Sequence, residues 1–125
     1  MELSNAINWF EIPVSDFERA KQFYSAIYGY EMPEMMMQST RMGMLPYQQD
    51  GGIGGAICYG EGYEPTMKGA RIYLNGGNDL DGVLGKVEAA GGKVILGKTK
   101  ITDEIGYFAI FTDTEGNQLS LHSPS

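Results

Sequence analysis

An internal repeat constrains the fold of this chain more than any other feature of its sequence. Four apolar residues of a helical stripe return 63 positions later. The two sets are Phe17, Ala20, Tyr24 and Ile27, and then Leu80, Val83, Val87 and Ala90. Gly29 and Gly92, which follow the two stripes, obey the same shift. Such spacing is typical of the buried face of a helix, so each half is predicted to contain one helix at the same place.

One strand-like segment precedes each predicted helix and three follow it. The first strands are predicted at 6–14 and 69–75, and the later ones at 30–37, 41–45, 54–59, 93–101, 106–112 and 118–122. In the first strand, Trp9 and Glu11 are predicted on one face, and Phe10 and Ile12 on the other. The sequence therefore predicts an α+β fold of two βαβββ repeats, at about residues 6–60 and 69–123, within a single domain spanning 1–125.

Turn and capping residues mark where these elements begin and end. Ser15 and Glu18 have the spacing of a capping box, so Ser15 is expected to cap the first helix. Asn78 and Asp79 offer a capping side chain to the second helix. The segment 60–65, rich in glycine and ending in proline, is expected to link the repeats, and 113–117 to form a hairpin loop.

The composition excludes several classes of protein. Hydrophobic residues make up 42% and charged residues 20%, which is a globular balance. A net charge of −7 with scattered Lys and Arg argues against nucleic acid as a partner. No apolar run approaches the roughly 20 residues that span a bilayer, and no membrane partner is expected. The single cysteine, Cys58, and a first segment without a leader pattern favour a cytoplasmic location.

Several local strings resemble those of one known superfamily. They are Trp9 to Asp16, Arg19-Ala20 with Phe23-Tyr24, Gly29, Ala89 to Val94, and Asp113 to Asn117. In their order and spacing they resemble the vicinal oxygen chelate superfamily, which includes glyoxalases, bleomycin-resistance proteins and extradiol dioxygenases. Within it they most resemble bacterial proteins described as related to lactoylglutathione lyase. The resemblance covers about residues 7–122, and it implies curved mixed sheets around a cavity.

The resemblance also implies where a metal would be held, because metal-dependent members take one ligand from the first and the last strand of each repeat. Those positions here are Trp9, Cys58 or a neighbour, Arg71 and Ser120. Tryptophan has no lone pair suited to a metal, arginine is always cationic, and serine is at best a weak ligand. Cys58 alone does not make a zinc site. No metal cofactor is therefore expected.

The same positions supply the candidate ligand-binding residues. Arg71 either grips an anionic ligand or forms an ion pair with Glu11, and both interpretations remain open. Tyr73 lies on the same strand face as Arg71, and Ser120 on the same face as His122, so all four are expected to line the cavity.

The remaining candidates each have an ordinary structural alternative. Trp9 either stacks on a flat ligand or is a core aromatic residue, and Cys58 more often fills a core than reacts. His122 is either an acid or base, or a solvent-exposed residue near the C-terminus. Six methionines between 32 and 44 form either an adaptable pocket wall, or core or dimer contacts.

Three classes of function fit these residues. The leading hypothesis is a metal-free or weakly metal-dependent protein that binds a small organic, possibly anionic, molecule between Trp9, Arg71, Tyr73 and the methionines. The alternative is a glyoxalase-like lyase or isomerase in which Glu11 removes a proton beside a carbonyl and Arg71 stabilises the enolate. The third is a dimerisation module without a ligand. A homodimer is expected because superfamily members commonly close their open sheets between chains.

Overall fold

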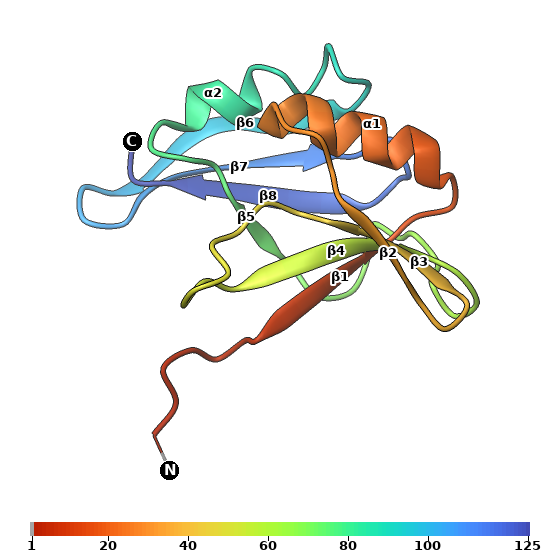
Figure 1. Ribbon diagram of the computed structural model, residues 1–125. Helices are drawn as coiled ribbons and strands as arrows, with labels where there is room; N and C mark the ends of the chain where they lie inside the picture. The colour runs from red at the N-terminus through yellow and green to blue at the C-terminus, as the bar shows by residue number, and fades with distance from the viewer. Residues whose placement is uncertain (1) are drawn as a thin grey trace.

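The protein forms two four-stranded mixed sheets, one from each repeat (Figure 1). The computed structural model describes residues 2–125. The first repeat comprises β1 (Trp9–Pro13), α1 (Phe17–Tyr28), β2 (Glu34–Met37), β3 (Thr40–Met44) and β4 (Gly54–Tyr59). The second comprises β5 (Tyr73–Asn75), α2 (Leu80–Leu84), β6 (Lys93–Thr102), β7 (Gly106–Thr112) and β8 (Gln118–Ser123). The strand orders β1-β4-β3-β2 and β5-β8-β7-β6 are identical in plan, which confirms the predicted α+β fold.

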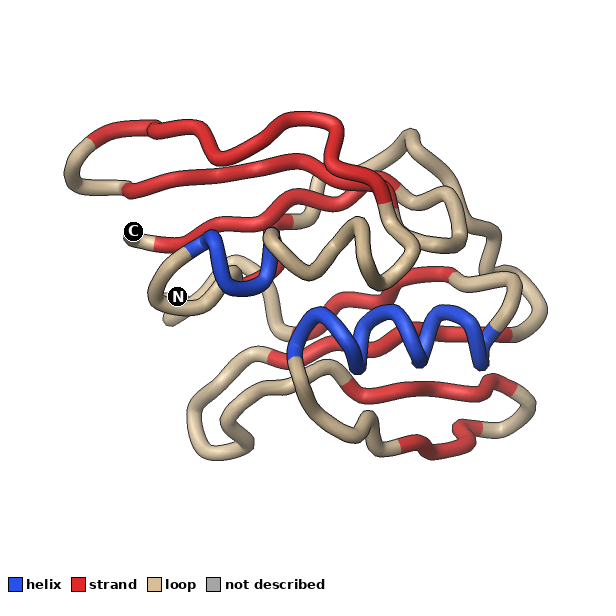
Figure 2. Tube along the Cα trace, turned by 90° about the horizontal axis from the view of Figure 1, so that it is seen from above, coloured by secondary structure: helices blue, strands red, loops and turns tan. Residues whose placement is uncertain are grey.

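Both helices lie on the same side of the molecule (Figure 1). Viewed from above, α1 lies along the first sheet and α2 beside the second (Figure 2). The main core fills the space between helices and sheets, where Phe23, Tyr24 and Phe111 are almost fully buried. The opposite surface of each sheet has no helix on it. We call these surfaces the first-sheet outer face and the second-sheet outer face.

Helix α1 begins one residue later than the capping-box prediction. Asp16, with an extended backbone, is the N-cap and accepts a hydrogen bond from the Arg19 amide. Ser15 instead donates its amide and its hydroxyl to the Glu115 carboxylate, because the loop after β7 brings that side chain to the helix terminus. Gly29, at φ 64°, ends the helix as predicted, in a conformation that favours glycine.

Helix α2 is much shorter than the periodicity predicts. It ends at Leu84, and residues 85–91 continue as turns in which amides bond to carbonyls three or four residues earlier. Two glycines, Gly82 and Gly85, fall in and directly after the helix and weaken it. Val87 is nevertheless fully buried, so the predicted apolar stripe packs inward without a regular helix.

Three predicted strands are also shorter in the structure. β1 begins at Trp9, β2 at Glu34 and β5 at Tyr73, so Arg71 precedes its strand. One backbone bond extends the pairing of β5, from the Ser120 amide to the Ile72 carbonyl. β1 and β5 are edge strands, and an edge strand is paired only along the length of its one neighbour.

A buried polar loop joins the two repeats. Asp113 accepts hydrogen bonds from the Tyr24 hydroxyl at 2.8 Å and from the Asn117 side chain at 3.0 Å. The same Asn117 amide group donates to the Pro13 carbonyl at 2.7 Å. The loop of the second repeat is thereby fixed to β1 and α1 of the first. No helix among residues 2–125 is long and apolar enough to cross a membrane.

Candidate functional site

The predicted site residues lie on the outer faces of the two sheets. Strand alternation places Phe10 and Ile12 in the core and Trp9 and Glu11 on the first-sheet outer face, as predicted. Cys58 shares that face through its pairing with Met42. The second-sheet outer face carries Tyr73, Ser120 and His122, and Arg71 lies two residues before β5, next to this sheet. The structure therefore brings the seven residues together as two groups, on different sheets.

Glu11 is the polar centre of the first-sheet outer face. Its Oε1 accepts a hydrogen bond from the Tyr63 hydroxyl at 2.6 Å, and its Oε2 one from the Trp9 indole at 3.4 Å. Trp9 is 37% exposed and meets the ring of Tyr47 edge to face, with centroids 6.1 Å apart. Trp9 is therefore not the core aromatic residue of the structural alternative.

Tyr63 is a site residue that the sequence interpretation missed. It lies in the linker between the repeats and folds back over the first-sheet outer face. Its hydrogen bond to Glu11 and partial burial raise its pKa to about 12, so its hydroxyl is a neutral donor at physiological pH. An aromatic residue within a glycine-rich linker is the only signal in the sequence, and it does not specify a partner.

Cys58 forms part of a small apolar cluster with Met42 and Ala56, and its side chain is buried. Burial, followed by the nearby Glu11 carboxylate, raises the pKa of the thiol to about 12. The thiolate is the nucleophile and metal-binding form, so the structure favours the core interpretation of this cysteine.

The methionines divide between the two predicted roles. Met32 and Met42 are buried, whereas Met35, Met36 and Met37 of the edge strand β2 are each about half exposed. Pairing of Met35 with Met42 places both on the first-sheet outer face. The methionine-rich segment thus supplies core contacts and an exposed apolar surface at once.

Tyr73 and Ser120 are directly paired on the second-sheet outer face. The ring of Tyr73 also contacts Phe108, with centroids 6.4 Å apart. Ser120 is only 1% exposed, and its Oγ has no hydrogen-bond partner among residues 2–125. A buried hydroxyl without a partner is unusual in a folded protein.

Arg71 is not the partner of Glu11 within one chain. Among residues 2–125, Arg71 forms no ion pair, and Glu11 bonds only to Trp9 and Tyr63. Glu11 lies in β1 of the first sheet and Arg71 precedes β5 of the second, which is why the ion-pair alternative is not realised within the chain. The general base and the enolate-stabilising group of the lyase hypothesis are therefore not assembled in a single chain.

His122 is partly buried rather than solvent-exposed, although it lies near the C-terminus. It is held in β8, and its Nε2 lies 2.7 Å from the carbonyl oxygen of Ile105. With Nε2 as the donor in that bond, Nδ1 is the ring nitrogen that remains available.

Backbone pairing identifies the residue at the position that the sequence analysis left as Cys58 or a neighbour. Glu11 pairs with Ala56 as Tyr73 pairs with Ser120. Ala56 is thus the counterpart of Ser120, and Cys58 is the counterpart of His122. The four positions at which the family resemblance implies metal ligands are then Trp9, Ala56, Arg71 and Ser120. These side chains include no imidazole, carboxylate or thiolate, so they do not fit a divalent metal.

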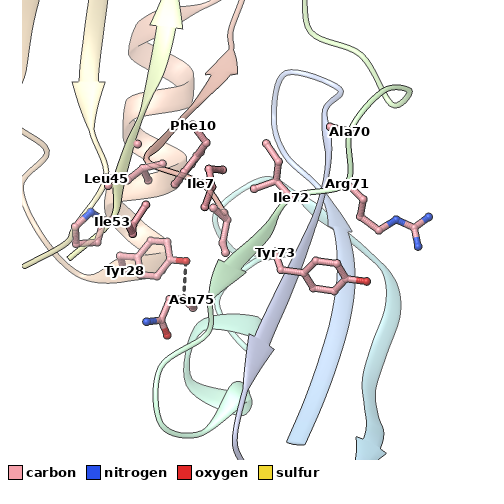
Figure 3. Close-up of a pocket in the computed structure, with 14 residues that line it drawn as sticks. Ile7, Phe10, Tyr28, Leu45, Ile53, Ala70, Arg71, Ile72, Tyr73 and Asn75 are labelled. Atoms are coloured by element: carbon pink, nitrogen blue, oxygen red, sulfur yellow. Dashed lines mark hydrogen bonds between the residues drawn. The ribbon is translucent and has the colours of Figure 1, made fainter. Parts of the chain in front are cut away.

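A largely apolar cavity of about 460 Å³ lies between the two repeats. Its wall includes Ile7, Phe10, Tyr28, Ile53 and Ile72. The Tyr28 hydroxyl closes one side through a 2.8 Å hydrogen bond to the Asn75 carbonyl. Figure 3 shows Arg71 and Tyr73 at the rim, with the guanidinium and the phenol pointing away from these apolar side chains.

Comparison with known proteins identifies the family. Residues 7–44 match the family described as bleomycin resistance protein-like N-terminal. A glyoxylase-like domain-containing protein of Didymella fabae is 32% identical over 94% of this chain and 92% of its own.

Solved structures share the fold across their whole length. TnmS3, an antibiotic binding protein from Streptomyces sp. CB03234, is 26% identical, with a TM-score of 0.63 over 100% of this chain and 99% of its own. A glyoxalase/bleomycin resistance protein/dioxygenase family enzyme from Burkholderia phytofirmans PsJN is 15% identical, with a TM-score of 0.67 over 94% and 98%. The chain belongs to the glyoxalase and bleomycin-resistance family of the vicinal oxygen chelate superfamily.

Proposed function

We propose that this protein binds a small, largely apolar organic molecule bearing an anionic or carbonyl oxygen, and that it does so without a metal ion. The observation that carries this proposal is the buried Ser120 hydroxyl, which has no partner among residues 2–125. Leaving such a group unpaired costs about 1–3 kcal/mol. A ligand oxygen at the second-sheet outer face would supply the missing hydrogen bond.

Arg71 supports an oxygen-bearing ligand at the same face. Its guanidinium is exposed and has no ion-pair partner among residues 2–125. The planar guanidinium suits two parallel hydrogen bonds to a carboxylate. Tyr73, on the same strand face, adds an aromatic ring and a hydroxyl beside Ser120.

Two further points support binding without a metal. The side chains at the four family positions, Trp9, Ala56, Arg71 and Ser120, offer poor metal ligands. Among the solved structures of this fold, TnmS3 is described as an antibiotic binding protein. We therefore expect elemental analysis of protein purified without chelator to find no near-equimolar nickel, zinc or iron.

The test uses 2-naphthoate as the probe, with affinity measured by calorimetry. Arg71→Ala is expected to weaken binding by at least about ten-fold, as loss of a charge-assisted hydrogen bond would. Ser120→Ala is expected to weaken binding and also to raise the melting temperature of the free protein, because the unpaired hydroxyl is gone. Lys93→Ala, which removes a cation from the edge strand β6, is the matched control. Unchanged affinity in Arg71→Ala would contradict the proposal.

We also propose that a second copy of the chain covers part of the outer faces. Met35 and Met37 of the edge strand β2 are 48% and 53% exposed on the first-sheet outer face, away from Trp9 in β1 at the opposite edge. Exposed apolar surface of this extent favours association. Sedimentation at micromolar concentration is expected to give a homodimer, and a stable monomer would exclude this arrangement.

A further inference from the structure

Glu11 is the only charged strand residue on the first-sheet outer face. The other charged strand residues of this sheet, Glu34 and Arg41, lie on the helix side, where they form ion pairs with each other and with Lys21 and Glu18 of α1. Around Glu11, strand pairing places Met42, Met44, Ala56 and Cys58, and no basic side chain.

The carboxylate of Glu11 is held by neutral donors. Tyr63 and Trp9 each give it one hydrogen bond, and no Lys or Arg among residues 2–125 lies within ion-pair distance of it. The pKa values of Tyr63 and Cys58 are both raised to about 12, so these neighbours stay uncharged at physiological pH. The centre of this face therefore carries one negative charge without a counter-charge.

The groups beside Glu11 suit a particular kind of counter-charge. The indole of Trp9 is partly exposed, and Tyr47 packs against it and over Gly54. Aromatic faces attract cations, and methionine side chains adapt to irregular apolar groups. A small inorganic cation would gain little here, since a single carboxylate is a poor metal site.

We infer that the first-sheet outer face contains a subsite for an organic cation, a quaternary or tertiary ammonium group with apolar substituents, held by Glu11, Trp9 and Tyr63. This inference rests on the proposed small-molecule binding. It assigns a positively charged ligand group to the first sheet, whereas the proposed anionic or carbonyl oxygen lies at the second. The net charge of −7 assists the approach of a cation.

Lys68 marks the limit of the subsite. It shares with Glu11 a groove of about 290 Å³ between the repeats, yet it makes no ion pair with the carboxylate. On the outer face the neighbouring Trp9 is 37% exposed, so we expect a cation to approach Glu11 from that side.

The experiment uses three probes that share a benzyl group. Benzyltrimethylammonium is the cation, neopentylbenzene is its uncharged isostere, and phenylacetate is the anion. Trp9 is the only tryptophan in the chain, so its fluorescence reports binding at this face directly. The intact protein is titrated at low ionic strength, because salt screens exposed charges. Glu11→Gln is compared with Glu104→Gln, which removes an exposed carboxylate from the turn between β6 and β7.

The wild type is expected to bind benzyltrimethylammonium at least about ten-fold more tightly than neopentylbenzene, and Glu11→Gln to lose that preference. Glu104→Gln is expected to retain it. Equal or tighter binding of phenylacetate, an unchanged preference in Glu11→Gln, or no binding of the cation would each overturn the subsite. Naphthoate binding that depends on Arg71 would survive those results, so failure here is distinguishable from failure of the proposed function.

Discussion

Glu115→Gln is expected to destabilise the protein in a way that depends on pH. The Glu115 side chain is fully buried, and its carboxylate receives hydrogen bonds from the side chain of Arg19 at 2.7 Å and the amides of Ser15 and Asp16 at 3.0 and 2.7 Å. Burial acts to raise its pKa, but these bonds and one from Thr114 outweigh burial and lower the pKa to about 2.

The magnitude follows from the difference between folded and unfolded states. Each pH unit between the ordinary value of 4.5 and the folded value of about 2 is worth about 1.4 kcal/mol, so ionised Glu115 contributes about 3 kcal/mol at neutral pH. Because the folded pKa is the lower one, this contribution is complete above the unfolded value and is lost as pH falls from about 4.5 towards 2. Glutamine keeps the shape but removes the charge that Arg19 contacts.

Urea unfolding of the wild type and Glu115→Gln between about pH 7 and pH 3 measures this contribution. The variant is expected to lose about 2–3 kcal/mol above pH 6, and the difference from wild type is expected to shrink below about pH 4.5. Glu104→Gln, an exposed carboxylate without these bonds, is the control and should follow the wild type. A difference that stays constant down to pH 3 would refute the argument.

Three further outcomes follow from individual contacts. Gly55→Ala is expected to cost about 1–3 kcal/mol, because a Cβ there would lie 2.4 Å from the Phe10 ring, whereas Gly97→Ala, with nothing within 4 Å, should be nearly neutral in thermal melts. Cys58 is expected to resist thiol reagents at about pH 8 in the native state and to react only on unfolding, since its pKa is about 12; rapid native reaction would contradict its burial. Arg71→Ala should leave the melting temperature unchanged, because Arg71 has no ion-pair partner among residues 2–125; strong destabilisation rescued by Glu11→Gln would instead reveal a pair between chains.

The repeat was the most informative part of the sequence, because apolar periodicity reports burial and both halves bury the same face of the same elements. Phe17, Ala20, Tyr24 and Ile27 are all buried, as predicted. The helix after Asp79 was predicted too long because Val87 and Ala90 keep the apolar period of a helix. Gly82 and Gly85 disfavour the helical backbone, so the regular helix ends at Leu84. Burial was therefore predictable where regular hydrogen bonding was not.

The candidate site was predictable only to the level of a strand face. Alternation correctly placed Ser120 and His122 on one face of β8, because the side-chain period of a strand does not depend on the rest of the fold, whereas Arg71 precedes β5 and lies outside that period. Whether Glu11 pairs with Arg71 was left open by the sequence, because it depends on how two separate sheets are arranged; among residues 2–125 the pair does not form. The contact of Tyr63 with Glu11 was missed for a similar reason, because a linker has no period that sets its direction.

The separation of structural and candidate binding groups explains how this scaffold tolerates a changed site. The polar network that joins the repeats, from Glu115 to Ser15 and Arg19 and from Asp113 to Tyr24, lies on the helix side and bridges positions far apart in the chain. Trp9, Ala56, Arg71 and Ser120, at the positions where the resemblance implies metal ligands, contribute nothing to that network, so other side chains could stand there without loss of the interactions that unite the repeats. Replacing a ligand set there changes the charge and shape offered to a small molecule while the core stays intact. Stability and ligand class in this fold are therefore expected to vary independently, except where a side chain such as Ser120 is buried unpaired at the boundary between them.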